Sequence, residues 1–255
     1  MPTPKFQNLV TRLKIKIKQS QTPVPGFIIG LSGTDSLTAF YALLTAVREL
    51  EAEGFRRVPI RALHYVAAGR KTPSWFETAA AAWIKEVAGD EVSLEVLVPL
   101  GGNEDQQRWA DIHLRALNDV ESHEGMPTRK PIPYEPGNNF WVVGCTNLTE
   151  FTLGKFSLLS DSVSIQPIRS LWKSEIMDIC ARLNVPQPVM EAARFADCIC
   201  GRDELAAENI ELIDAILRND FDPGAHDPDL LKKLIDYVRE TKRAFDFRQR
   251  VPYIV

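Results

Sequence analysis

Apolar runs alternate with helical patterns along most of the chain. In chain order the predicted strands are 27–30, 58–65, 92–99, 140–144 and 163–167, and the predicted helices between them are 35–53, 74–87, 104–120, 146–156 and 170–183. Strands that alternate with helices in this way are typical of a parallel sheet covered on both faces. The pattern therefore predicts an α/β fold.

The two ends of the chain are predicted to be helical. At the start, five apolar residues follow a helical spacing with Lys and Arg between them: Phe6, Leu9, Val10, Leu13 and Ile17. We expect this amphipathic helix, 6–18, to pack on the domain or on a partner subunit, the alternative being a membrane surface. Two further helices are predicted at 207–218 and 228–247, whereas 186–206 has no strong period.

Length and composition indicate a single domain. A chain of 255 residues can bury a substantial core, and its net charge of −4 offers no basic patch for nucleic acid. The four cysteines, Cys145, Cys180, Cys198 and Cys200, lack paired zinc spacing, and no signal peptide or long apolar span is present. We expect reduced thiols, a cytoplasmic location and no membrane. The proline-rich stretch 121–138 is either a lid, a subunit contact or a disordered excursion.

The turn after the first strand is a candidate phosphate site. Small residues, including Ser32 and Gly33, precede a helix that Thr34 or Asp35 can cap. Free backbone N–H groups at a helix start favour a phosphate, and Asp35 beside them could hold a divalent cation. The alternative is an ordinary strand-to-helix turn with a good cap.

Three segments are expected to meet at one edge of the sheet. Ligands of open α/β sheets bind outside the carboxyl ends of the strands. The segments that follow the first, second and fourth predicted strands are 32–36, 64–69 and 145–150. Asp35 and Glu150 would then face one crevice and supply the oxygen ligands that Mg²⁺ prefers. The alternative for Glu150 is an exposed, hydrated residue at a helix start.

Several motifs in this order resemble a known family. The loop 32–36 resembles the S-G-G-x-D-S pyrophosphate loop of the N-type ATP pyrophosphatases. Three later segments narrow the likeness to the ammonia-dependent NAD synthetases: 144–150 is similar to G-T-x-N-x-x-E, 154–161 to G-x-F-T-K-x-G-D, and 167–176 to P-I-x-x-L-x-K-x-x-V. Further likenesses follow in the family's order at Ala196-Asp197, Asp203-Glu204-Leu205, Ile213-Asp214 and 248–252.

The resemblance implies a fold, an activity and partners. The fold would be adenine-nucleotide alpha-hydrolase-like, a Rossmann-like parallel sheet with a helical C-terminal part. The enzyme would use ATP and Mg²⁺ to transfer AMP to the carboxylate of nicotinic acid adenine dinucleotide, with loss of pyrophosphate, and ammonia would displace AMP. The resemblance also implies a homodimer and, because no glutaminase domain is present, free ammonia or a separate ammonia-supplying protein.

The same resemblance assigns roles to residues. The phosphates would be cradled by Ser32, Gly33, Thr34 and Ser36, and Mg²⁺ would be held by Asp35 and Glu150. Lys173 would neutralise the triphosphate and, with Asp35, form the catalytic pair; otherwise it is a solvated helix lysine. The nucleotide would contact Cys145 and Thr146, and Asp161 would lie near the dinucleotide.

The chain also departs from the family pattern. The phosphate loop is one residue short, which places β-branched Thr34 in a tight turn. Cys145 replaces a threonine and is a weaker hydrogen-bond partner. Further replacements occur at Leu158, Ser160, Ser162 and Phe195. Two hypotheses follow: an amide-forming ligase, for this or another carboxylate, or a module that has lost catalysis and retains nucleotide binding or dimerisation.

Overall fold

The computed structural model describes most of the chain. The described residues are 3–20, 24–65, 79–97, 104–116, 122–123, 126–127, 140–194 and 204–249. Several sequence predictions lie outside them: the segment 66–69, the start of the helix predicted at 74–87, most of 121–138, the residues 195–203 with Cys198 and Cys200, and 250–252.

Four parallel strands form the central sheet, which confirms the α/β prediction. Their order is β3 (Val92–Leu97), β2 (Ile60–Tyr65), β1 (Phe27–Gly30) and β6 (Trp141–Val143). In the register, Phe27 of β1 lies opposite Ile60 on one side and Trp141 on the other. β1 is therefore a central strand, and the segment that follows it lies in the middle of the sheet's carboxyl edge.

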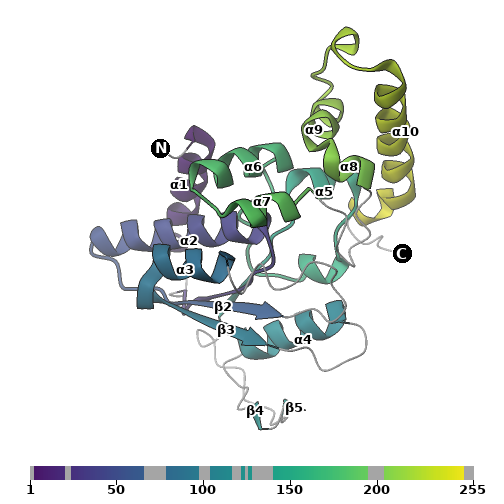
Figure 1. Cartoon of the computed structure of the whole chain (residues 1–255). Coiled ribbons are helices and arrows are strands. Elements are labelled where there is room, and N and C mark those ends of the chain that lie inside the picture. Colours follow the sequence, from purple (N-terminus) through teal and green to yellow (C-terminus); the bar gives the residue numbers. More distant parts are fainter. Residues whose placement is uncertain are drawn as a thin grey trace.

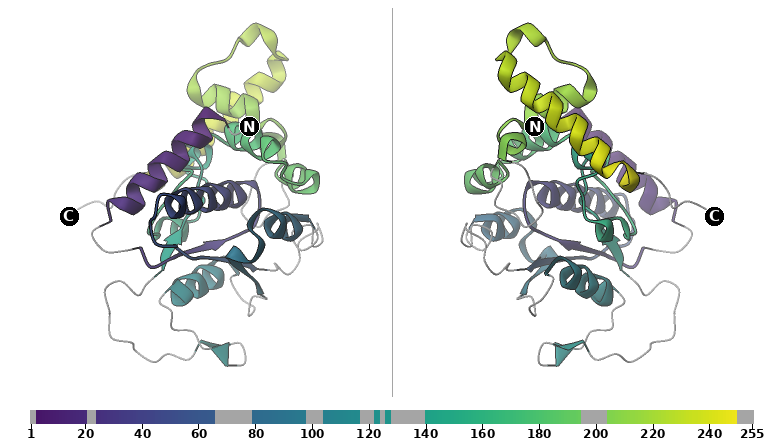
Figure 2. Two further views of the ribbon diagram at one scale, coloured as in Figure 1. Left: turned by 90° about the vertical axis from the view of Figure 1, so that its left-hand side faces the viewer. Right: turned by 90° about the vertical axis from the view of Figure 1, so that its right-hand side faces the viewer.

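Helices cover both faces of the sheet (Figure 2). One face carries α2 (Thr34–Ala52), α3 (Ala81–Ala88), α6 (Lys173–Arg182) and α7 (Gln187–Ala192), and the opposite face carries α4 (Glu104–Ala116). Successive residues of a strand point to opposite faces. Accordingly Phe27 and Ile29 join the core beneath α2, whereas Ile28 packs with Trp109 and Ile112 of α4.

The N-terminal helix α1 (Pro4–Lys18) packs on α2. All five residues of the apolar stripe, including Phe6 and Leu13, are buried, and Thr3 caps the helix by accepting from the Phe6 N–H. The prediction of an amphipathic helix that packs on the domain is confirmed. Within the described residues, no helix has the length and apolar character that a membrane crossing requires.

The C-terminal helices form a second, smaller cluster (Figure 1). It contains α5 (Leu148–Leu153), α8 (Glu204–Glu208), α9 (Ile210–Arg218) and α10 (Pro228–Phe245), followed by a short turn of helix, η5 (Asp246–Gln249). Its buried side chains are Leu153, Ile213, Leu234 and Val238. The smaller strands β4 (Ser122–His123) and β5 (Met126–Pro127) pair antiparallel.

Two predicted elements differ from the structure. The strand predicted at 163–167 is reduced to one bridge between Val143 and Ile165, because the Ser164 hydroxyl accepts the Val142 N–H that a strand carbonyl would otherwise accept. Helix α6 begins at Lys173 rather than at Ser170, since a turn closed by the Leu171 N–H and the Ile168 carbonyl precedes it.

Candidate functional site

The loop between β1 and α2 is closed by a serine side chain. Gly33 is the N-cap of α2, so the prediction of Thr34 or Asp35 as the cap was wrong, and Thr34 lies in the first helical turn rather than in the loop. The Ser36 hydroxyl oxygen accepts the N–H groups of Ser32 at 2.8 Å and of Gly33 at 3.1 Å, and it donates to the Gly33 carbonyl at 2.9 Å. The two N–H groups expected to cradle a phosphate are therefore bonded to Ser36.

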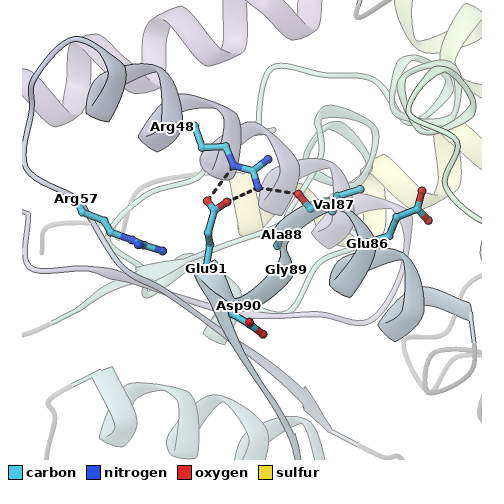
Figure 3. A pocket seen from close by; sticks show the side chains of 8 residues that line it. All are labelled: Arg48, Arg57, Glu86, Val87, Ala88, Gly89, Asp90 and Glu91. Carbon is cyan, nitrogen blue, oxygen red and sulfur yellow. Dashed lines mark hydrogen bonds and ion pairs between the residues drawn. The ribbon is translucent and has the colours of Figure 1, made fainter.

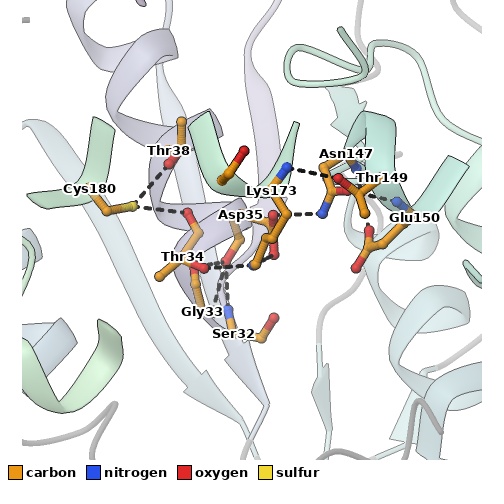
Figure 4. A network of polar contacts seen from close by, with 12 residues as sticks. Ser32, Gly33, Thr34, Asp35, Thr38, Asn147, Thr149, Glu150, Lys173 and Cys180 are labelled. Atoms are coloured by element: carbon orange, nitrogen blue, oxygen red, sulfur yellow. Dashed lines mark hydrogen bonds and ion pairs between the residues drawn. The ribbon is translucent and has the colours of Figure 1, made fainter. Parts of the chain in front are cut away.

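Lys173 reaches this loop from the start of α6 (Figure 4). Its ammonium group donates to the Thr34 hydroxyl at 2.8 Å and forms an ion pair with the Asp35 carboxylate. Lys173 is only 6% exposed. It is therefore not the solvated lysine of the alternative interpretation, and its charge lies directly beside the candidate phosphate loop.

Asn147 links Asp35 to Glu150. It caps α5 by accepting the Glu150 N–H at 2.8 Å, and its side-chain amide donates to Asp35 Oδ1 at 2.9 Å. Glu150 in turn accepts the Asn147 N–H at 3.3 Å, which completes a capping box. Asn147 lies in the segment 144–150 whose motif resembles the family, but the sequence did not identify it as a partner of Asp35.

A cation site at this position is chemically reasonable. Both oxygens of Asp35 already interact with donors, one with the Lys173 ammonium and the other with Asn147. Among the described residues no group of three or more His, Cys, Asp or Glu could hold a metal ion. Mg²⁺ normally takes one or two carboxylates and completes its shell with water and phosphate oxygens. Asp35 and Glu150 are carboxylates of the kind this requirement allows, and both contact Asn147.

A pocket of about 90 Å³ opens beside these groups. One wall is polar and includes Glu150 and Lys173, and the other is made mainly by apolar residues of the C-terminal cluster, Leu153, Ala206, Ala207, Ile210, Ile213 and Tyr237. The pocket therefore joins the carboxyl edge of the sheet to the C-terminal helices.

A larger hollow, of about 430 Å³, lies at the amino end of β3 (Figure 3). There Arg48 binds both carboxylate oxygens of Glu91 at 2.8 and 2.9 Å and donates to the Val87 carbonyl at 2.8 Å. Because ligands of parallel sheets bind at the carboxyl edge, we do not assign the candidate site to this hollow.

Comparison with known proteins agrees with the motifs. Residues 128–252 match the family model for NAD synthase. Over these residues the chain is similar to this family. An NH(3)-dependent NAD(+) synthetase of Thermoplasma volcanium is 34% identical over 118 residues, which are 44% of this chain and 46% of the relative. The aligned part thus spans about half the length of that relative.

Two broader likenesses extend over nearly the whole chain. An NH(3)-dependent NAD(+) synthetase of Methanosarcina acetivorans is 25% identical and covers 89% of this chain and 86% of its own. Among solved structures, an NMN synthetase from Francisella tularensis superimposes with a TM-score of 0.69 at 17% identity, over 99% of this chain and 98% of the other. At that identity the superposition establishes the shared fold.

Cys145 and Thr146 lie inside the segment that is similar to the NAD synthase motif, directly before Asn147. The pKa of the Cys145 thiol is raised well above its usual range, first by burial and then by the negative charges of Asp35 and Glu150. Cys145 is therefore a neutral thiol close to both carboxylates. The buried Thr146 hydroxyl is hydrogen-bonded to the Ser160 hydroxyl at 3.0 Å.

Asp161 belongs to a separate polar cluster. Its carboxylate accepts hydrogen bonds from Arg169 at 2.6 Å and from Gln166 at 2.7 Å. The Arg169 guanidinium also lies 3.8 Å from the centre of the Phe151 ring. The carboxylate that the NAD synthase resemblance assigns to the dinucleotide is therefore already paired with a cation.

Proposed function

We propose that this chain is an ATP-dependent amide-forming ligase. It transfers AMP to a carboxylate with release of pyrophosphate, and ammonia then displaces AMP. The curated relatives are named NH(3)-dependent NAD(+) synthetases, which favours nicotinic acid adenine dinucleotide as the carboxylate. The observation that carries the proposal is the contact of Lys173 with Thr34 and Asp35. About half of the chain separates Lys173 from these two residues in the sequence.

The chemistry requires a cation where Lys173 lies. A carboxylate is a poor electrophile until it carries a good leaving group, and pyrophosphate becomes more negative as it departs. In this proposal the Lys173 ammonium donates to the phosphate oxygens, and the Thr34 hydroxyl, 2.8 Å from that ammonium, holds it at the mouth of the loop. Asp35 and Glu150 would hold Mg²⁺, which would supply further neutralisation of phosphate charge.

The pairing of Ser36 supports the second hypothesis, a binding module without catalysis. Its hydroxyl already accepts the N–H groups of Ser32 and Gly33. A phosphate can bind these two N–H groups only if their hydrogen bonds to Ser36 break. For the ligase we propose that the hydroxyl then donates to the phosphate. If that exchange does not occur, the chain retains the fold without stabilising the leaving group.

The two hypotheses are separated by measuring pyrophosphate release with Mg-ATP and ammonium. The acids tested are nicotinic acid adenine dinucleotide and nicotinic acid mononucleotide, the second because of the NMN synthetase neighbour. We expect release with one of them. Lys173→Ala should lower kcat by roughly 10²–10³-fold, the loss typical of removing one transition-state donor.

Asp178→Ala is the matched control for the Lys173 variant. Asp178 lies on the same helix, its side chain is 53% exposed, and it pairs only with Arg182 one turn away among the described contacts. Its kinetics should equal those of the unchanged protein. ATP binding by calorimetry without pyrophosphate release from either acid would contradict the ligase for these substrates and favour the binding module.

A further inference from the structure

Helix α6, which presents Lys173, supplies only part of its own N-terminal capping, because Glu175 accepts the Trp172 N–H at 3.0 Å. Its N-cap residue is Trp172, whose side chain has no acceptor for the free N–H groups of the first turn. Two of these groups are bonded to other helices. The Lys173 N–H donates to the Thr149 hydroxyl of α5 at 2.9 Å, and the Ser174 N–H donates to Asp214 Oδ2 of α9 at 2.7 Å.

Asp214 joins these contacts into one unit. Its other oxygen, Oδ1, accepts from the Thr149 hydroxyl at 2.5 Å, so the same carboxylate contacts α5 and α6. The residue is fully buried, at 0% exposure. A buried carboxylate is costly unless hydrogen bonds satisfy it, and negative charge is favourable at a helix N-terminus.

We propose that Asp214 is a positioning residue that holds the start of α6 so that Lys173 contacts Thr34 and Asp35. This inference rests on the proposed function, in which Lys173 acts on the triphosphate. No described hydrogen bond joins Asp214 to the loop, and it acts through Thr149 and Ser174. Glu150 follows Thr149 directly, so the same bonds tie its helix to that of Lys173.

Packing alone does not require an acid at this position. The neighbouring Ile213 belongs to the apolar core of the C-terminal cluster, and an apolar residue at 214 would fill space equally. The Thr149 hydroxyl and the Ser174 N–H reach different oxygens of Asp214, so the side chain needs an acceptor at each of the two positions. Asp214→Asn keeps the shape but replaces one acceptor with a donor, which leaves one of the two partners unsatisfied.

The test measures the protection of Lys173 in the folded protein. The full chain is treated briefly with acetic anhydride, and the modification of each lysine is quantified by mass spectrometry. In the unchanged protein Lys173 should react slowly relative to Lys232, whose side chain is 79% exposed. In Asp214→Asn the Lys173 rate should rise by about tenfold or more, as expected when a buried charged hydrogen bond is lost and the helix start opens locally.

Two controls separate local opening from general loss of stability. Lys14 is paired with Glu49 and Glu53 and lies on α1, so its rate reports opening of the rest of the molecule. Val238→Ala removes buried methyl groups from the same C-terminal cluster without touching Asp214. It should leave the ratio of the Lys173 rate to the Lys14 rate unchanged, whereas Asp214→Asn should raise that ratio.

Thr149 supplies a second pair of variants if Asp214→Asn does not fold. Thr149→Val removes the hydroxyl between Asp214 and the Lys173 N–H and should also expose Lys173, and Thr149→Ser should preserve its protection. An unchanged ratio in Asp214→Asn, or in Thr149→Val when the first variant is unfolded, overturns the proposal. Pyrophosphate release is measured in parallel: if the unchanged protein releases none, the ligase proposal fails, and the acetylation ratio still decides the role of Asp214.

Discussion

Gly154 ends helix α5 in a left-handed conformation, with φ at +72°. A Cβ added there would lie 2.5 Å from the Cβ of Phe245 and 2.7 Å from its carbonyl oxygen. Next to it, Gln249 donates to the carbonyls of Phe151 and Thr152 at the end of the helix. The last part of the described chain therefore holds the carboxyl end of the helix whose other end carries Glu150.

Gly54 provides a matched comparison for Gly154. It has φ at +84°, and a Cβ there would meet nothing within 4 Å. We expect Gly54→Ala to lower the free energy of unfolding by roughly 1 kcal/mol, the cost of a left-handed residue. Gly154→Ala should cost ~1–3 kcal/mol more because Phe245 must move. Urea unfolding of both variants checks this, and equal losses would contradict the close approach.

Helix α1 shows which contacts hold one element on another. Its apolar stripe, with Phe6 and Leu13, is buried against the domain, and this burial supplies most of its stabilisation. Lys14 and Lys18 lie beside the stripe and both pair with Glu53 near the end of α2. Such exposed ion pairs add little stability, but they are sensitive reporters of the docked helix.

The titration of Glu53 tests this arrangement. Hydrogen bonds from Lys14 and Lys18 lower its pKa from 4.5 to about 2. Because the folded pKa is lowered, the contribution of these pairs is present above 4.5 and is lost as the pH falls towards 2. NMR titration should find this low value, and the double variant Lys14→Ala, Lys18→Ala should return it towards 4.5. Lys16 is an exposed residue of α1, and Lys16→Ala should leave the Glu53 pKa low. A Glu53 pKa that stays low in the double variant would contradict the ion pairs.

Element boundaries show where sequence patterns are reliable. Two features were predictable because helical spacing and stop signals are local: the apolar stripe of α1 and the end of α6 near Asn184. Asn184 has a positive φ. The strand predicted at 163–167 and the helix start predicted at Ser170 were wrong. In both places a side chain or a turn satisfied the backbone in a way that the apolar pattern does not record.

The whole molecule places the candidate site between two packed bodies. Asp35 belongs to α2, and Lys173 belongs to α6, which packs on α2 and on α9. Asp214 and the apolar wall of the pocket belong to the C-terminal cluster. The relative position of these bodies therefore controls the geometry of the site. The resemblance to the ammonia-dependent NAD synthetases implies a dimer of two identical chains. We propose that this protein is a homodimer in the cytoplasm.

The oligomeric state is directly measurable. Size-exclusion chromatography with light scattering should give twice the 28.7 kDa of one chain, and the mass should not change on moderate dilution. The measurement is made with and without Mg-ATP, since a ligand that binds the dimer better shifts the equilibrium towards it. A mass of one chain at every concentration in both conditions would contradict the homodimer.

Local patterns in the sequence were sufficient for the α/β class, the amphipathic helices and the choice of Asp35 and Glu150 as candidates, because spacing is a property of neighbouring residues. The choice of Lys173 came from the resemblance to the ammonia-dependent NAD synthetases. The pairing of the Ser32 and Gly33 N–H groups with Ser36, and the contacts of Asn147 and Asp214, emerged only from the folded chain. The Asn147 contact with Asp35 joins residues 112 positions apart. Hydrogen bonds depend on distance and direction in space, and a linear pattern carries neither.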